Sequence, residues 1–242
     1  LHWGLFTQDM SEATVNSPIQ EGGMLAAIVG TLIMVGLALI FTLPIAILTA
    51  LYLTEIKGKF ARPIRFLVQA MSGVPSIVAG LFILSSIVYP VTGERSGLMG
   101  ALALSILMIP TVARTAEEVL LLIPNDLREA GLALGATQWR TVAMVVVPAV
   151  KSGLVTAVIL GVARVIGETA PILLVSGGGD ATNFNPVSGP MGSIPFYVWN
   201  AFLLGGSEES TQRTWAGLLV LLLWVLILFT IARYISSRSQ KR

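Results

Sequence analysis

Cysteine is absent from this 242-residue chain, and charged residues make up only 12% of it, whereas ordinary soluble domains keep roughly 25%. The lack of cysteine excludes disulfides and thiolate metal sites. The single histidine, His2, cannot build a catalytic or metal centre alone. No Gly-x-x-x-x-Gly-Lys-[Ser/Thr] sequence occurs, so the chain cannot form a Walker A phosphate loop. With 55% hydrophobic residues, much of its surface must face something other than water.

Long apolar stretches predict an all-α membrane protein with one membrane domain over 23–235. A bilayer core of ~30 Å needs ~20 apolar helical residues. Five stretches qualify as spanning helices: Met24–Leu53, Phe66–Tyr89, Leu98–Ile123, Val145–Val175 and Trp215–Tyr234. Internal prolines are tolerable there because neighbouring helices and hydroxyl groups can satisfy the freed carbonyls.

The positive charges predict how the chain is oriented. Twelve of the 15 cations fall in three segments: Lys57, Lys59, Arg62 and Arg65; Arg114, Arg128, Arg140 and Lys151; Arg233, Arg238, Lys241 and Arg242. Only Arg95 and Arg213 lie on the opposite side, and Arg164 is intramembrane. Since cytoplasmic loops are enriched in Lys and Arg, the tail 236–242 is expected inside the cell. The polar segment 1–22 is expected outside, and its polarity excludes a signal peptide.

A second external segment, 176–214, is rich in Gly, Pro, Ser and Asn. Within it, the amphipathic stretch Ile194–Leu204 has two interpretations. It is either a helix lying at the membrane interface with its Tyr and Trp among the headgroups, or a docking surface for an external partner.

The cytoplasmic segment 124–148 carries its own helix signals. Pro124 breaks the preceding helix, and Asp126 with Glu129 predicts a capping box for a short helix over Leu127–Leu134. Gly135 suits the left-handed position that ends it. Thr137 then caps a second short helix, and Pro148 marks the start of the next membrane helix.

This loop is longer than a simple helix connection requires. It is expected to bury four apolar side chains: Leu132, Leu134, Trp139 and Val142. Two interpretations stay open, a self-packed amphipathic connector and a surface built to fit a partner.

The spacing of this loop resembles the EAA loop of ATP-binding-cassette importer permeases. Glu129-Ala130-Gly131 is followed after three residues by Gly135, and nine residues later by Val145-x-Val147-Pro148. Gly131, Val145 and Val147 replace Ala, Ile and Leu of the family pattern. The resemblance implies that 126–148 couples to a separate ATPase subunit, through Glu129, Ala130, Gly131, Gly135, Trp139 and Pro148. The chain itself would then bind no cofactor, and ATP and Mg²⁺ would belong to the ATPase.

Arg164 and Glu168 lie four residues apart, on one face of the fourth predicted span and well inside its apolar run. An unpaired Arg at mid-bilayer costs ~2.5–3.5 kcal/mol. A structural ion pair would neutralise both, although two leucines would be cheaper. We therefore expect an anion path in which Arg164 binds a tetrahedral oxyanion through paired N–H donors. Glu168 would orient Arg164 or accept the proton of monohydrogen phosphate.

Three further residues are candidates for the same path. Arg114 is either the next anion station or a cation that snorkels to the membrane interface. Ser72 and Ser76 either line the path or bond back to helix carbonyls near Pro75.

A wider resemblance joins these pieces. Ser72-Gly-Val-Pro-Ser76, Arg114-Thr-Ala-Glu-Glu118, the EAA loop and Gly161-x-x-Arg164-x-x-Gly167-Glu168-Thr-Ala-Pro171 occur in this order. Together they are similar to the second membrane subunit of phosphate-specific ATP-binding-cassette importers. The resemblance implies a type I importer permease fold with a sixth helix before Leu1, in the bacterial inner membrane. It also implies phosphate passage at Arg164 and Arg114.

The implied partners are a homologous second permease, two ATPase subunits, an external phosphate-binding protein and membrane lipid, with no nucleic acid. No catalytic residue and no metal site are expected in this chain. The alternatives are a permease for another oxyanion such as sulfate or molybdate, and an ion-coupled secondary transporter in which Glu168 carries a proton. A sensing role would be additional.

Overall fold

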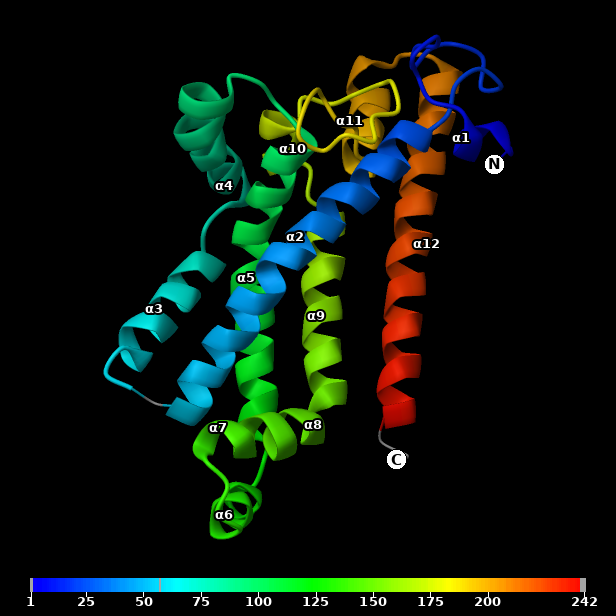
Figure 1. Cartoon of the computed structure of the whole chain (residues 1–242). Coiled ribbons are helices and arrows are strands. Elements are labelled where there is room, and N and C mark those ends of the chain that lie inside the picture. Colours follow the sequence, from blue (N-terminus) through cyan, green and yellow to red (C-terminus); the bar gives the residue numbers. More distant parts are fainter. Residues whose placement is uncertain (1, 57, 240–242) are drawn as a thin grey trace.

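The protein is almost entirely helical (Figure 1). The computed structural model describes residues 2–56 and 58–239, so Lys57, Lys241, Arg242 and the end of the tail predicted over 236–242 lie outside the described residues. Within these described residues, three helices are long and apolar enough to cross a membrane, or up to five spans if each of two bent helix pairs counts as one. The predicted all-α membrane class is confirmed.

Helix α5 (Gly97–Leu121) is the centre of the fold, packed against α2 (Leu25–Leu51) and α9 (Lys151–Ile166). Small residues let these helices approach closely: a Cβ at Gly161 would collide with Val112 of α5. Within the most apolar part of α5, 67% of the residues are buried, against 11% for α12 (Glu208–Ser239). Helix α12 therefore presents an apolar surface suited to lipid.

The second predicted span is sharply bent. It consists of α3 (Ala61–Ser72), then α4 (Ser76–Ile83) continued by the π-helix η2 (Leu84–Thr92), with an angle of 103° between the two parts. Pro75 precedes α4 with extended ψ of 137°, and its missing N–H cannot continue the α3 ladder. Both parts lie on one side of the bundle (Figure 1), where α3 contacts α5 and α4 contacts α5 and α10.

The fourth predicted span is broken twice. The chain leads from η3 (Val142–Val146) through α8 (Val147–Ala149) into α9. At Val150 the chain changes direction, with an angle of 74° between the segment Gln138–Ala149 and α9. Pro148 therefore lies in α8, and the membrane helix begins at Lys151, later than predicted. Helix α9 ends at Ile166, and a separate helix α10 (Ala170–Val175) follows.

The bundle has two distinct ends (Figure 1). At the α6 end lie α6 (Asn125–Ala133), α7 (Gln138–Thr141) and α8. At the α11 end lie α1 (Gly4–Thr7), the loop 176–193 and α11 (Ile194–Leu204). Helix α12 begins at Glu208, before the predicted Trp215, and runs from the α11 end toward the α6 end.

Candidate functional site

The EAA-like segment folds as two short helices joined by a tight turn. Gly135 has φ of +80°, which confirms the predicted left-handed position. Thr137 caps α7 as predicted, its Oγ1 accepting from the Arg140 N–H at 3.4 Å. The predicted capping box is wrong: α6 begins at Asn125 after Pro124, with no side-chain cap. An Asn at the first helical position leaves Asp126 inside the first turn, where its charge favours the helix dipole instead.

Helix α6 packs on α7 through its one buried residue, Gly131. A Cβ at this position would come within 2.6 Å of Thr141 Cγ2. Gly131, which replaces the alanine of the family pattern, therefore leaves the space that Thr141 occupies.

Most of the apolar side chains expected to be buried in this loop are exposed. Leu134 is 89% exposed, Trp139 61% and Leu132 50%, and only Val142 is buried. The two helices are too short to cover these side chains, so the prediction that they are buried is wrong for three of the four residues. Exposed apolar patches rimmed by polar groups mark interaction sites. Glu129 and Ala130 are also exposed on α6.

Two ion pairs anchor this end of the bundle, and both escaped the sequence analysis. Arg128 of α6 binds Glu55 at 2.8 Å, across 73 positions of the chain. Arg65 of α3 binds Glu117 of α5 at 2.6 Å. The charge pattern assigns Arg65 and Arg128 only to the cytoplasmic side and does not predict their partners. The buried Glu117 inside an apolar helix was a signal that a partner must exist.

Arg164 and Glu168 do not share a helix face. Arg164 lies in the last turn of α9, whereas Glu168 follows the helix end, its backbone N–H donating to the Val165 carbonyl at 3.2 Å. The Arg164 side chain is exposed and Glu168 is half-buried. Neither makes a side-chain hydrogen bond or ion pair within the described part of the chain. The structural ion pair is therefore not formed. A cation at a helix C-terminus is favoured by the helix dipole.

The other candidates of the path lie on neighbouring helices. Arg114 is exposed on α5. The Ser72 hydroxyl donates to the Val68 carbonyl at 3.0 Å, so it bonds back to its own helix. Ser76 starts α4, whose Gly80 packs against Pro171 of α10, close in sequence to Glu168.

Arg213 is the largest fully buried side chain at the α11 end. Its Nη2 donates to the carbonyls of Ser17 at 3.2 Å, Pro18 at 3.0 Å and Glu21. The charge pattern predicts Arg213 only as an external cation, whereas in the structure its side chain holds the segment 2–23 against α12. A buried charge is tolerated only with such partners.

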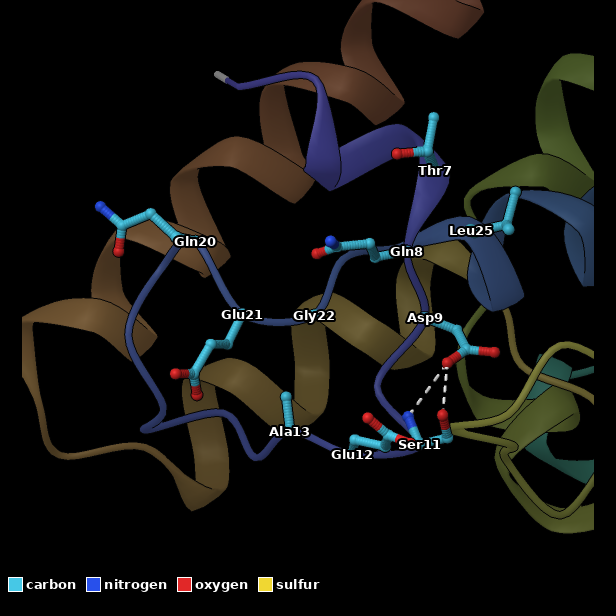
Figure 2. A pocket seen from close by; sticks show the side chains of 10 residues that line it. All are labelled: Thr7, Gln8, Asp9, Ser11, Glu12, Ala13, Gln20, Glu21, Gly22 and Leu25. Atoms are coloured by element: carbon cyan, nitrogen blue, oxygen red, sulfur yellow. Dashed lines mark hydrogen bonds between the residues drawn. The ribbon is translucent and has the colours of Figure 1, made fainter.

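Asp9 ties this segment to the loop 176–193. The hydrogen bond from the Ser11 hydroxyl, with further bonds from Thr182, lowers the pKa of Asp9 to about 2. Burial, with the charge of Asp9, raises the pKa of Asp180. Asp9 and Ser11 line a cavity of about 490 Å³. Figure 2 shows the hydrogen bonds between these two residues. None of the predicted path residues lines that cavity.

Helix α11 packs against α12 and α2. Tyr197 is buried, whereas Phe202 is 71% exposed and Trp199 is 41% exposed. Both interpretations of this helix, at the membrane interface or as a docking surface, fit that arrangement. Within the described residues, no group of three or more His, Asp or Glu side chains is placed to hold a metal ion.

The sequence and the fold of this chain are similar to those of known transport proteins. Residues 42–241 match the model of the family described as binding-protein-dependent transport system inner membrane component. The phosphate transport system permease protein PstA 1 of Mycobacterium tuberculosis is 36% identical over 224 residues, covering 91% of this chain and 72% of that protein. The PstA of Pasteurella multocida is 37% identical over 227 residues, covering 93% and 80%.

Solved structures share the fold. An inward-facing MetNI methionine ABC transporter chain superposes with a TM-score of 0.69 at 20% identity, covering 87% of this chain and 91% of that one. A chain of a bacterial ABC transporter for the acidic polysaccharide alginate gives 0.64 at 17% identity, covering 88% and 79%. These solved structures show the fold, and the sequence matches show that the chain belongs to the family of binding-protein-dependent transport system inner membrane components.

Proposed function

We propose that this chain is the permease subunit of an ATP-driven importer that carries inorganic phosphate across the bacterial cytoplasmic membrane. It is not an enzyme: a separate ATPase subunit hydrolyses ATP. The observation that carries the proposal is Arg164, an unpaired exposed guanidinium at the end of an apolar helix, in a chain 36% identical to a phosphate permease over 91% of its length.

Arg164 and Arg114 are suited to successive anion stations. Helices α5 and α9 run antiparallel, with Gly161 against Val112 and Gly153 against Val119. From the first of these contacts, a rise of 1.5 Å per residue separates the two arginines by about 7–8 Å along the bundle. Facing lipid, an Arg at mid-bilayer costs ~2.5–3.5 kcal/mol. We infer that a homologous second permease covers this side and encloses a polar path between the two subunits.

The guanidinium of Arg164 binds a tetrahedral oxyanion with paired N–H donors. Glu168, beyond the helix end, accepts a hydrogen bond from the remaining proton of monohydrogen phosphate. Sulfate lacks that proton and would leave the carboxylate facing an anion without a donor, which opposes its passage. Ser76 lines the path from α4. Ser72, already bonded to Val68, contributes less.

The loop 126–148 is the coupling element, with the α6 end in the cytoplasm. Exposed Trp139, Leu132 and Leu134 form the apolar surface that docks in the ATPase subunit, with Glu129 and Ala130 beside them. Gly131, Gly135 and Pro148 shape the loop. The α11 end then faces outward and receives a phosphate-binding protein. A secondary transporter would not need such a docking surface.

Phosphate uptake by the assembled transporter in vesicles tests the path. Replacing Arg164 by Gln removes a charged hydrogen-bond donor that contributes ~1.5–3 kcal/mol, so uptake should fall about tenfold or more. Arg95→Gln, at an exposed loop cation, is the matched control. Unchanged uptake by Arg164→Gln would remove Arg164 from the path, and inhibition by sulfate but not by unlabelled phosphate would refute the phosphate assignment.

A further inference from the structure

At the α6 end of the bundle, every nitrogen of the Arg128 guanidinium donates a hydrogen bond. Its Nε donates to Glu55 Oε1 at 3.1 Å and Oε2 at 3.0 Å, and its Nη2 donates to Oε1 at 2.8 Å. The Glu55 side chain is 6% exposed and that of Arg128 19%. This is a bidentate, largely buried pair, the geometry in which an Arg–carboxylate contact is strong and directional.

The same guanidinium also binds the end of α5. Nη1 donates to the Ile123 carbonyl at 2.7 Å and Nη2 to the Leu120 carbonyl at 3.0 Å. The last carbonyls of a helix have no partner within it, and a cation placed there is favoured by the helix dipole. Arg128 therefore joins α6 to the end of α5 as well as to Glu55.

Glu55 receives a second bond from the coupling loop. It lies in η1 (Tyr52–Ile56), a π-helical turn that continues α2, and its backbone carbonyl accepts from Gln138 Nε2 of α7 at 2.6 Å. Both short helices of the loop are thus fastened to one residue at the end of α2. Single π-helical turns inside helices are frequent at functional sites.

Apolar packing of α6 itself contributes little to this connection, whereas Val142 and Val146 of η3 form one apolar cluster with Ala50, Leu51 and Leu120. Gly131 is the only buried residue of α6 in the described structure, and its neighbour, Thr141, belongs to the same loop. The contacts of α6 are mainly with α7 and η3. Apart from the three residues that join it to α5 and the indirect apolar route through η3, α6 is held to α5 and η1 by polar contacts, of which those of Arg128 are the most numerous.

We propose that Glu55 and Arg128 form the mechanical link that passes displacement of α6 to α2 and α5 during transport. Glu55 and Arg128 are positioning residues that act through the helices they join. The proposal rests on the proposed function, in which α6 docks on an ATPase subunit. An equivalent pair, Arg65 with Glu117, joins α3 to α5, but it touches no part of the coupling loop.

The test uses the complete transporter in vesicles, with phosphate uptake and ATP hydrolysis measured together. Glu55→Gln keeps the shape of the side chain and removes its charge. We expect the ATPase subunits to stay bound, while phosphate transported per ATP hydrolysed falls about tenfold or more, because a buried Arg loses its counter-charge. Glu118→Gln, at an exposed carboxylate of α5, should leave this ratio unchanged.

Because the chain has no cysteine, a covalent link can replace the ion pair. In the doubly substituted Glu55→Cys, Arg128→Cys chain, a short cleavable thiol cross-linker should restore the transport ratio, and cleavage should abolish it again. Recovery on cross-linking identifies a mechanical role, since a variant that had merely misfolded would not recover.

Three outcomes separate the claims. If the unaltered transporter shows no ATP-driven phosphate uptake, the proposed function fails. If it transports phosphate and Glu55→Gln does so with the same ratio, only the link is refuted. Loss of ATPase binding in Glu55→Gln would equally refute the link, because the pair would then shape the dock instead of transmitting motion from it.

Discussion

Restoring the family's alanine at position 131 should weaken the coupling loop, and trimming Thr141 should repair it. A Cβ built on Gly131 lies 2.6 Å from Thr141 Cγ2, 2.9 Å from its Oγ1 and 3.3 Å from its Cβ. Thr141 is 3% exposed, and as a β-branched residue it has few rotamers with which to move aside. Gly131→Ala must therefore separate α6 from α7 or strain the turn between them.

The expected size follows from the nature of the contact. Inserting one methyl group into a packed site costs ~1–3 kcal/mol, which corresponds to about a 5- to 150-fold change in a local equilibrium. The gain of Ala over Gly in helix propensity, ~0.8–1 kcal/mol, offsets part of this. Thr141→Ala removes both atoms closest to the new Cβ, so Gly131→Ala with Thr141→Ala should regain most of the loss and keep the propensity gain.

Hydrogen exchange of the amides in α6 and α7 measures this local stability, with phosphate uptake per ATP as the functional readout. Gly131→Ala alone should speed exchange in 125–141, and the double variant should return it toward the original rate. If the two substitutions act additively, with no recovery in the double variant, the contact between these helices is not what selects glycine at 131.

Four further predictions concern single positions. Gly135→Val should cost ~1–2 kcal/mol. The cost comes from the left-handed backbone alone, because the space around a Cβ at this position is open. Phosphate uptake per ATP should therefore fall in Gly135→Val and fall less in Gly135→Asn, and equal uptake by the two variants would contradict the prediction. Arg213→Lys should release the segment 2–23, because one ammonium group cannot reproduce the hydrogen bonds of a guanidinium to three carbonyls. Limited proteolysis should then cut this segment faster in Arg213→Lys than in Arg95→Lys. Equal rates in the two variants would show that Arg213 does not hold the segment. The pKa of Asp9 is lowered from 3.8 to about 2, so the stability that its ionised carboxylate contributes is present above pH 3.8 and is lost as the pH falls toward 2. The rate of hydrogen exchange at the Thr182 amide should rise as the pH falls over that range. In Asp9→Asn this pH dependence of the exchange rate should disappear. The pKa of Asp180 is raised, so its ionised carboxylate destabilises the folded state at neutral pH. Asp180→Asn should therefore slow hydrogen exchange of the Thr182 amide or leave it unchanged, and faster exchange would contradict this prediction.

Local signals in the sequence predicted most of the elements correctly. The lengths of the apolar stretches gave the membrane class, because ~20 helical residues are needed to cross a bilayer. Gly135 and Thr137 gave the turn and cap of the coupling loop, since each depends on backbone conformation within a few residues. The same reasoning failed at Asp126, where Pro124 displaced the start of the helix.

The arrangement of the candidate path residues differs in part from the prediction. Arg164 and Glu168 were identified because charge within an apolar stretch is costly. Their supposed shared face assumed an unbroken helix, whereas α9 ends at Ile166. Exposure of Trp139 and Leu134 could not be read from periodicity, since it depends on how little neighbouring structure reaches these side chains.

The sequence by itself determined what depends on composition and short-range spacing: a membrane environment, helical spans, the turn at Gly135 and the absence of a nucleotide loop. Tertiary structure alone decided which charges meet. Arg128 binds Glu55 across 73 positions, Arg65 binds Glu117 across 52, and Arg213 reaches Ser17 across 196. No local pattern specifies such pairs, because they exist only where the packing of distant helices brings a buried guanidinium to its acceptors.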